Sequence, residues 1–395
     1  DAYNLLVAQT TDAASNIVRA VNDYRVLVPD QMADPNGNQV TVSFDALGLV
    51  VGTALMGKSG ENLGDLLTDF SADLPQAQID AFYGANDPHT LAAPLLGNAT
   101  SRVVYDVNKF FHTRQNAPND SSQWLPAFAA TIARETHVSD LTDGQQSKLQ
   151  ITFSYSDGLG REIQKKVQAE PGAVVDSGPV INPRWAGNGW TIFNNKGKPV
   201  RQYEPFFSQL PQGHQFEFGT VVGVSPILCY DPVTRVVATI HPNHSYEKVV
   251  FDPWHQATWD VNDTVLQDDP TSDGDVGDFF KRLPAADYSP TWRVQYAGGT
   301  AEQQDAAIKT AAHANTPTLA YFDTLGRTFL TIADNAAAGK YATRVELDIQ
   351  NNQRSVTDAL GRKIMIYDYS LPGQRLYQSS ICLLYTSPSP RDRQK

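Results

Sequence analysis

Short stretches of alternating apolar and polar residues recur along this chain, and turn-forming residues separate them. Residues 149–155 alternate in this way up to a turn, and residues 161–167 resume the alternation after it. Residues 233–240 follow another turn in the same manner. A period of two that is bounded by Gly, Pro, Asp and Asn is typical of β-hairpins. The pattern therefore predicts a chain built largely from hairpins.

The N-terminal part shows the same pattern. Residues 17–28 and 40–44 flank the turn sequence Asp-Pro-Asn-Gly-Asn at 34–38, which predicts one more hairpin. For the C-terminal part, we expect most of residues 140–375 to be β-strand, with the turn sequences between the strands. Helices and long loops are then insertions into a chain of strands.

Helical patterns are few. Short helices are expected at residues 61–70 and 75–83, and a longer one at residues 301–314, because Ala, Gln and Lys dominate that segment. Loops are expected at residues 169–183 and 267–277, where turn residues cluster. None of these segments marks a convincing domain boundary, since strand patterns resume on both sides.

The turns share a sequence repeat: an aromatic or β-branched residue, then Asp, two variable residues, Gly and Arg. Several acidic or amide positions of this repeat lie about 35–37 residues apart, within the period range of repeat architectures. The clear copies contain Asp157, Gly160 and Arg161; Asp323, Gly326 and Arg327; and Asp358, Gly361 and Arg362, and degenerate copies contain Asp45 and Gly48; Asn194, Gly197 and Lys198; Asp231 and Arg235; and Asp252.

Each copy has a physical interpretation as a hairpin turn. An Asp or Asn side chain can accept hydrogen bonds from backbone amides two residues on, and Gly supplies the positive φ of a tight turn. A catalytic carboxylate pair is needed once, whereas a turn residue is needed in every hairpin. The recurrence therefore favours a structural role for these aspartates.

The composition agrees with strands joined by turns, since the 395 residues are 41% hydrophobic and include 24 Pro and 27 Gly. A formal charge of −12 makes nucleic acid and anionic membranes poor candidate partners. No stretch approaches the roughly 20 apolar residues that span a bilayer, and the N-terminal sequence lacks the pattern of a signal peptide. It also lacks an initiator Met, so we expect the chain to begin within a longer protein.

Few residues suggest chemistry. Cys229 and Cys382 are too few for a disulfide scaffold or a metal site, and Cys229 is expected to be a small buried hydrophobe. His241 and His244 lack a third ligand nearby in sequence. The acidic run at 268–275 lacks the ligand alternation and terminal Glu of a calcium loop, so we expect it to be solvated.

No nucleophile elbow, dinucleotide fingerprint or phosphate-binding loop is present. The sequence therefore predicts no catalytic, cofactor-binding or metal-binding residue, no cofactor, and a protein that is not an enzyme. Aromatic residues could form a sugar-binding or peptide-binding surface, but packing within the sheets is the favoured interpretation. The tryptophans concerned are Trp185, Trp190, Trp254, Trp259 and Trp292.

The repeat and several longer segments of the sequence resemble a known family. The repeat resembles the YD or RHS repeat, and longer segments resemble the B component of Tc insecticidal toxin complexes. The resemblance covers residues 1–380 and implies a mainly β fold, in which a spiral of antiparallel hairpins with a few short helices forms part of a hollow shell. The segments that carry it are 160–166, 182–187, 193–207, 241–246, 251–263 and 339–348.

The resemblance also implies a function. In that family the B and C components together form a shell around the toxic C-terminal region of the C component, and a β-propeller of the B component docks on the pore-forming A component. The implied role is a secreted, extracellular virulence component that is not catalytic and that encapsulates and helps deliver a cytotoxic cargo. The implied partners are the C component with its cargo and, through an upstream region, the A component, without nucleic acid or direct membrane insertion.

Two other functions stay open from the sequence: a YD-repeat protein for adhesion, receptor binding or carbohydrate binding, and a carbohydrate-active enzyme. Converging carboxylates in a pocket would favour the enzyme. Residues 1–380 are expected to form one shell fragment. Residues 381–395 change composition abruptly and look like translated adapter sequence, so we expect a disordered, non-native tail that packs against nothing.

Overall fold

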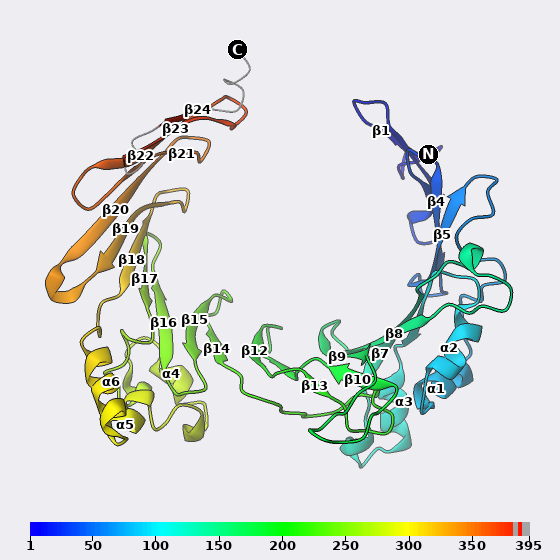
Figure 1. The fold of residues 1–395 in the computed structure, drawn as a ribbon, viewed down its shortest axis with the longest axis horizontal. Coiled ribbons are helices and arrows are strands. Elements are labelled where there is room, and N and C mark those ends of the chain that lie inside the picture. The colour runs from blue at the N-terminus through cyan, green and yellow to red at the C-terminus, as the bar shows by residue number, and fades with distance from the viewer. Residues whose placement is uncertain (382–385, 389–395) are drawn as a thin grey trace. The chain divides into compact units, whose positions relative to one another are not determined.

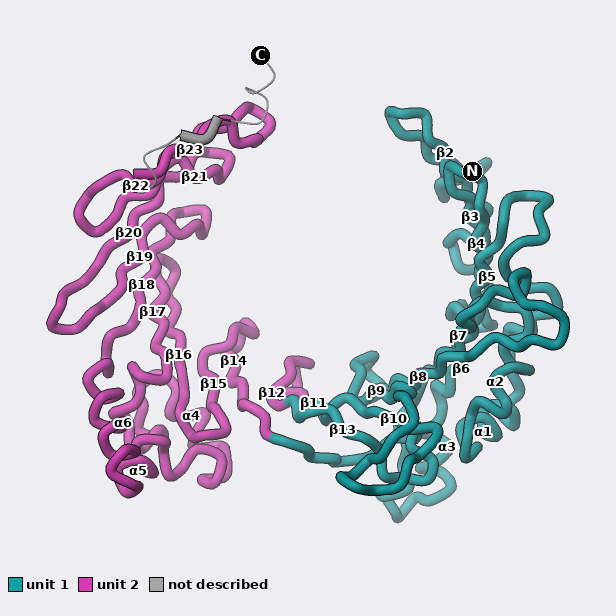
Figure 2. The backbone as a smooth tube through the Cα atoms, viewed as in Figure 1, with its two compact units in different colours: residues 1–192, 202–223 teal, residues 193–201, 224–395 magenta. Residues whose placement is uncertain are grey.

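The structure is a computed structural model that describes residues 1–381 and 386–388. The chain forms two compact units (Figure 2): unit 1 contains residues 1–192 and 202–223, and unit 2 contains residues 193–201 and 224–395. Each unit is built on an 11-stranded antiparallel sheet. Strands make up 36% of the residues and helices 16%, which confirms the expected mainly β fold with a few short helices.

The sheet of unit 1 is a meander in which strands that follow one another in sequence pair antiparallel, and one further short strand lies beside β10. Its strands are β1 (Gln9–Thr11), β2 (Ile17–Asp23), β3 (Val28–Ala33), β4 (Asn38–Phe44), β5 (Val50–Lys58), β6 (Ser101–Asp106), β7 (Ala127–Arg134), β8 (Leu149–Ser156), β9 (Glu162–Ala169), β10 (Arg184–Gly187) and β13 (Phe206–Phe207).

Helices cover part of this sheet and form the core of unit 1 with it (Figure 1). Alternate residues of β8, Ile151, Phe153 and Tyr155, are fully buried, so the strand predicted at residues 149–155 is confirmed. The ring of Phe153 stacks on Phe82, with ring centroids 5.6 Å apart. The helical elements are α1 (Gln76–Gly84), α2 (His89–Leu96), α3 (Lys109–Asn116), and the short 3₁₀ turns η1 (Ser121–Gln123) and η2 (Val138–Asp140).

The sheet of unit 2 is a second meander. A separate short hairpin, β11 (Thr191–Phe193) with β12 (Pro199–Gln202), lies where the chain passes from one unit to the other. The strands of unit 2 are β14 (Ile227–Tyr230), β15 (Val236–Ile240), β16 (Tyr246–Phe251), β17 (His255–Trp259), β18 (Thr318–Phe322), β19 (Thr328–Asp334), β20 (Lys340–Leu347), β21 (Gln353–Thr357), β22 (Lys363–Tyr369), β23 (Arg375–Ser380) and β24 (Thr386–Pro388).

A helical insertion between β17 and β18 packs on the first strands of unit 2. Tyr246 and Phe280 meet edge to face in its core, with ring centroids 5.0 Å apart. Cys229 is buried in the same core as a free thiol, and burial raises its pKa to about 11. The elements of the insertion are η3 (Pro270–Ser272), α4 (Gly277–Phe280), η4 (Ala285–Asp287), α5 (Trp292–Ala297) and α6 (Ala301–Ala311), and η5 (Ala336–Ala338) follows β19.

Two of the three predicted helices are confirmed. Helix α1 matches the prediction at 75–83, and α6 matches the prediction at 301–314. The start of α6 is fixed by a capping box, because the Gln303 N–H donates to the Thr300 hydroxyl (3.4 Å) and the Thr300 N–H donates to the Gln303 side chain (2.8 Å).

The helix predicted at 61–70 is wrong. Backbone groups of this segment bond to β5 and form no helical ladder: the Gly57 N–H donates to Leu63 O, and the Asp65 N–H donates to Leu55 O, both at 2.8 Å. Gly64 between them has φ +83°, and a Cβ atom there would lie 2.2 Å from Leu55 O. The close approach to β5 therefore replaces the helix.

The prediction that most of residues 140–375 are strand is wrong in extent. Fewer than half of these residues are in strands, because the long connection at 208–226 and the helical insertion at 260–317 interrupt the meander. The expected loop at 169–183 is confirmed, since residues 170–183 contain a single isolated bridge, Gly172 with Ile181.

Both ends of the chain differ in detail from expectation. The turn at 34–38 joins β3 and β4 as predicted, but residues 17–28 break into β2 and β3 at Leu27, which has φ +60°. Residues 386–388 form β24 and pair with β23. The prediction that the tail packs against nothing is therefore wrong for these residues. The remainder of the tail, 382–385 and 389–395, lies outside the described residues, and its non-native origin stays a prediction.

Candidate functional site: the repeated turns and the buried charges

The repeat forms a hairpin turn in which one Asp side chain binds three groups. Oδ1 of Asp323 accepts the backbone N–H groups of Leu325 (2.9 Å) and Arg327 (3.0 Å), and Oδ2 accepts Nε of Arg327 (2.7 Å). The Asp323 N–H donates to Arg327 O, and the Gly326 N–H donates to Asp323 O, both at 2.9 Å. Gly326 has φ +73°, which an L side chain disfavours. The motif thus encodes a five-residue turn with positive φ at its fourth residue.

Most other predicted copies lie in turns of this kind. The first residue of each accepts the backbone N–H of the fifth, and the fourth residue has positive φ. Where the fifth residue is Arg, its side chain also pairs with the Asp carboxylate. These copies are Asp157, Gly160 and Arg161; Asp358, Gly361 and Arg362; Asp231 and Arg235, with Thr234 at the fourth place; Asp45 and Gly48; and Asn194, Gly197 and Lys198.

The copy at Asp252 differs in length. The Asp252 N–H donates to His255 O at 2.9 Å, so this turn closes one residue earlier than the others. Oδ1 of Asp252 accepts the N–H groups of Trp254 and His255, both at 2.7 Å. No Gly with positive φ occurs in this turn, and Nδ1 of His255 pairs with Oδ2 of Asp252 as the Arg side chain pairs with Asp elsewhere.

The structure contains further copies that the Gly-Arg pattern does not include. In these copies the fifth residue is Asn instead of Arg. Its Nδ2 donates to Oδ2 of the turn Asp, as the Arg side chain does in the full motif. The signal in the sequence is Asp followed four residues later by Asn. These turns are Asp12 with Asn16, Asp34 with Asn38, and Asp348 with Asn352.

His241 and His244 belong to a related turn between β15 and β16. The His241 N–H donates to Ser245 O (2.8 Å), the His244 N–H donates to His241 O (2.9 Å), and His244 has φ +63°. His244 therefore takes the place that Gly takes in the full motif. Among the described residues, no group of three or more His, Cys, Asp or Glu side chains could hold a metal ion.

Hydrogen bonds within the turns favour the charged form of Asp323 and Asp358. The hydrogen bonds from the Arg327 side chain and from backbone N–H groups lower the pKa of Asp323, and the Arg362 side chain does the same for the pKa of Asp358. An acid with a lowered pKa is a weak general base near neutral pH. These side chains therefore serve as hydrogen-bond acceptors within the turn.

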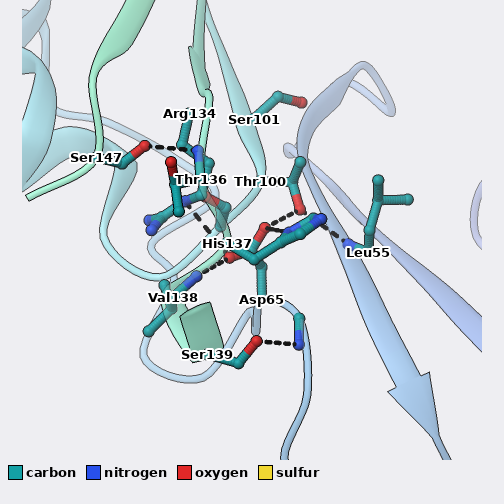
Figure 3. Close-up of polar contacts among 12 residues, drawn as sticks. Leu55, Asp65, Thr100, Ser101, Arg134, Thr136, His137, Val138, Ser139 and Ser147 are labelled. Carbon is teal, nitrogen blue, oxygen red and sulfur yellow. Dashed lines mark hydrogen bonds and ion pairs between the residues drawn. The ribbon is translucent and has the colours of Figure 1, made fainter. Parts of the chain in front are cut away.

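A separate polar centre lies in unit 1 around Asp65, a fully buried carboxylate (Figure 3). Oδ2 of Asp65 accepts the Thr100 hydroxyl at 2.6 Å and lies 2.7 Å from Nδ1 of His137. Oδ1 accepts the Val138 N–H at 2.7 Å and lies 3.6 Å from Nε of Arg134. One carboxylate thus joins the segment after β5, the start of β6, the end of β7 and the segment that follows β7.

The environment of Asp65 favours its charged form. Burial by itself raises the pKa, but the hydrogen bonds from Thr100, Val138 and His137 and the charge of Arg134 outweigh it, so the pKa lies below its ordinary value. A carboxylate that orients an imidazole also occurs in acid–base catalysis. Among the described residues, however, no hydroxyl or thiol is hydrogen-bonded to His137, so the arrangement is that of a cross-link between segments.

Unit 2 has its own buried charge cluster, within the acidic run that was expected to be solvated. Nζ of Lys248 lies 2.9 Å from Oδ2 of Asp273 and 2.7 Å from Oδ2 of Asp275, and the Tyr246 hydroxyl donates to Asp273 at 2.7 Å. The Asp273 side chain is 6% exposed. The expectation for residues 268–275 is therefore wrong at Asp273, because the buried Lys248 needs an anionic partner.

A third buried charge is Lys166, whose side chain is inaccessible to solvent and pairs with Glu217. Burial lowers the pKa of Lys166. The neighbouring Gln164 side chain donates to Glu217 O (3.0 Å) and accepts the Glu217 N–H (2.8 Å), which fixes this loop against β9. Each of these buried charges is thus engaged within its own unit.

The tryptophans differ in burial, and packing fits only some of them. Trp185 is 2% exposed in the core of unit 1, as packing predicts. Trp254 is 58% exposed, so packing is the wrong interpretation at that position.

Together, the meander sheets and the repeated turns define a class of protein: a β-repeat protein in which Asp-centred turns close many of the hairpins. Neither a scan of protein-family models nor a search of curated proteins finds a match to this sequence. Solved structures do match, and among them are TcdB2-TccC3 and a Tc holotoxin pore.

The chain is similar to the crystal structure of TcdB2-TccC3, with 21% identity and a TM-score of 0.61 over 95% of this chain and 16% of that one. The form without the hypervariable C-terminal region gives 19% identity and a TM-score of 0.63 over 95% and 19%. The Photorhabdus luminescens Tc holotoxin pore gives 20% identity and a TM-score of 0.62 over 96% and 19%. The chain has the fold of this part of the Tc toxin chains and spans less than a fifth of their length.

Proposed function

We propose that this chain is a wall segment of a toxin-complex shell, which encloses a cytotoxic cargo and takes no part in catalysis itself. The observation that carries the proposal is the continuous pairing of strands through each 11-stranded sheet, with a repeated turn at many of the hairpins, in a fold that matches Tc toxin chains over 95% of its length. Such repetition extends a surface instead of building one reaction centre.

The buried charges support the same proposal. Asp65, Lys166 and Lys248 are each paired inside a unit, where each ties a loop to a strand or joins separate segments. A catalytic group instead needs a free position toward a substrate. These residues therefore stabilise a rigid wall, at the cost of burying their charges.

The partners follow from this role. The C component with its cargo would complete the shell, and the A component would be reached through another part of the longer protein. Secretion as part of the toxin complex is the corresponding location. Among the described residues, no helix has the length and apolar character needed to cross a bilayer.

A chimera tests the proposal. Residues 1–381 replace the matching segment of TcdB2-TccC3, and limited proteolysis measures whether the hypervariable C-terminal region of that chain stays protected. The expected result is protection equal to that of a control in which the original segment is restored. A soluble, monodisperse chimera whose C-terminal region is digested at once would contradict the wall role.

A further inference from the structure

A cavity of about 490 Å³ lies in unit 1, bounded by α3, the turn between β8 and β9, and the loop that carries Phe216 and Phe218. This volume falls within the roughly 300–1,000 Å³ of typical small-molecule sites. All of the lining residues belong to unit 1. The cavity is therefore complete within one compact unit and has the size of a site for a small organic molecule.

Aromatic rings dominate the lining, and they come from separate parts of the chain. Phe110 meets Trp124 edge to face with ring centroids 5.9 Å apart, and Phe218 meets Trp190 in the same way at 4.8 Å. Phe218 is 83% exposed, and Phe111, which also lines the cavity, is 63% exposed. Single exposed apolar side chains are common, but several that converge on one cavity mark a binding site. The rings provide faces and edges against which another aromatic ring system can stack.

The described residues of the lining offer no unpaired charge. Asp157 is the one charged residue among them. Its Oδ1 accepts the backbone N–H groups of Leu159 (2.9 Å) and Arg161 (3.3 Å), and its Oδ2 pairs with the Arg161 side chain. Arg114 lies over the Trp124 ring but is not part of the lining. A charged ligand would therefore lose its hydration without gaining a partner of opposite charge, which favours an uncharged occupant.

Most hydrogen-bonding side chains of the lining are also engaged. Nε1 of Trp124 donates to Ala117 O at 2.9 Å, and the Ser156 hydroxyl accepts the Gly158 N–H at 3.2 Å. A polypeptide would bring a backbone N–H and C=O into this space with nearly every residue, and each buried group would need a partner. A small molecule with few polar groups avoids that cost, so it fits the lining better than a polypeptide segment does.

We infer that this cavity binds a small uncharged aromatic molecule against the rings of Phe111, Trp190 and Phe218. The inference goes beyond the wall role and does not depend on it, because the site lies within unit 1 and needs no complete shell. Stacking and the burial of apolar surface supply the affinity. The apolar lining selects against charge.

Three probes with one ring system test the charge of the ligand on the full chain by isothermal titration calorimetry: naphthalenemethanol, naphthoate and naphthylmethylamine. We expect the alcohol to bind at least about tenfold more tightly than either ion, because the buried charge of an ion would have no partner. Decahydronaphthalenemethanol lacks the aromatic rings and should bind about 3- to 10-fold more weakly than naphthalenemethanol. Equal or tighter binding of an ion or of the saturated alcohol, or no binding at all, would overturn the inference.

Matched variants locate the site. Phe218→Ala should weaken the binding of naphthalenemethanol about 3- to 10-fold, because one aromatic contact is lost, and Phe111→Ala should act in the same direction. Trp254→Ala removes an exposed tryptophan of unit 2 and should change nothing. Circular dichroism checks that each variant is folded, and either Phe variant suffices if the other is not. Binding that the folded Phe variants leave unchanged would assign the ligand to another place and refute the site.

A peptide-like probe separates the small molecule from a polypeptide segment. N-acetyltryptophanamide is uncharged and carries an aromatic ring system together with two amide groups of the backbone type. It should bind at least about tenfold more weakly than naphthalenemethanol, because its amides would be buried without partners. Binding as tight as that of the alcohol, or tighter, would overturn the assignment to a small molecule in favour of a polypeptide segment.

Discussion

Nη1 of Arg327 donates a hydrogen bond to the backbone carbonyl of Asp348 at 2.7 Å, and this ties the turn between β18 and β19 to the turn between β20 and β21. Arg327 also binds its own turn through Asp323. Unit 1 contains a similar link between turns from an Arg outside the repeat, since Nη1 of Arg25 donates to Asp45 O at 2.7 Å. The Arg of the repeat can therefore connect neighbouring hairpins as well as close its own.

The link predicts a difference between two copies of the motif. Arg362 pairs with Asp358 as Arg327 pairs with Asp323, but among the described residues it makes no bond to a neighbouring turn. Arg327→Ala should lower the free energy of unfolding by about 1 kcal/mol more than Arg362→Ala, the value of one net hydrogen bond. Urea denaturation followed by circular dichroism measures both. Equal losses would show that the link contributes nothing.

The fourth residue of the turn gives a second prediction. Gly326 has φ +73°, and a Cβ atom at this position would meet no other atom within 4 Å, so Gly326→Ala tests backbone conformation without a clash. We expect a loss of about 1–2 kcal/mol, the cost of the left-handed conformation for an L residue. Gly84→Ala, at the end of α1, also meets no atom but has no positive φ, and it should be neutral or stabilising. A thermal melt of each variant decides between the two effects.

Asp65 predicts a pH dependence. Its folded-state pKa is lowered, so it contributes stability that is complete above its unfolded pKa and is lost as the pH falls through the folded value. Asp65→Asn should therefore be less stable than the original at neutral pH, and the difference should shrink in acid. Asp143→Asn alters an exposed carboxylate in a nearby loop and is the control. Parallel curves of unfolding free energy against pH for all three proteins would contradict the role of Asp65.

The buried cluster of unit 2 predicts contrasting costs for two lysines. Lys248→Ala leaves Asp273 buried without its cation and should cost about 3–5 kcal/mol. Lys281→Ala breaks an exposed pair with Asp278, whose side chains are 59% and 79% exposed, and should cost about 1 kcal/mol or less. Chemical denaturation of both variants measures the contrast. Similar small losses would mean that the Asp273 cluster is solvated.

The proposed lack of catalytic activity is itself testable. The purified chain, once shown to be soluble and β-rich, should give no turnover on glycosides, peptides or a nicotinamide donor. Its prominent carboxylates are engaged in turns and cross-links. Turnover that Asp65→Asn or Asp273→Asn abolishes would refute the wall role in favour of an enzyme.

The sequence determined the turns, because their information is local. Asp323, Gly326 and Arg327 lie within five residues, and the bonds among them need no distant partner. The same holds for α6, where Thr300 and Gln303 specify the capping box within one turn. Alternation likewise predicted the strand β8, whose alternate side chains the structure shows to be buried.

Only the tertiary structure decided where the loops go and which charges are buried. The local sequence of residues 61–70 favours a helix, but in the structure this segment bonds to β5. The partners of Asp65 come from segments up to 73 residues away in the sequence. The acidic run that contains Asp273 predicts exposure to solvent. The buried partner of Asp273 is Lys248, which lies 25 residues away in the sequence. Such contacts depend on which strands become neighbours, and the energy of burying a charge is set by the partner that folding brings to it.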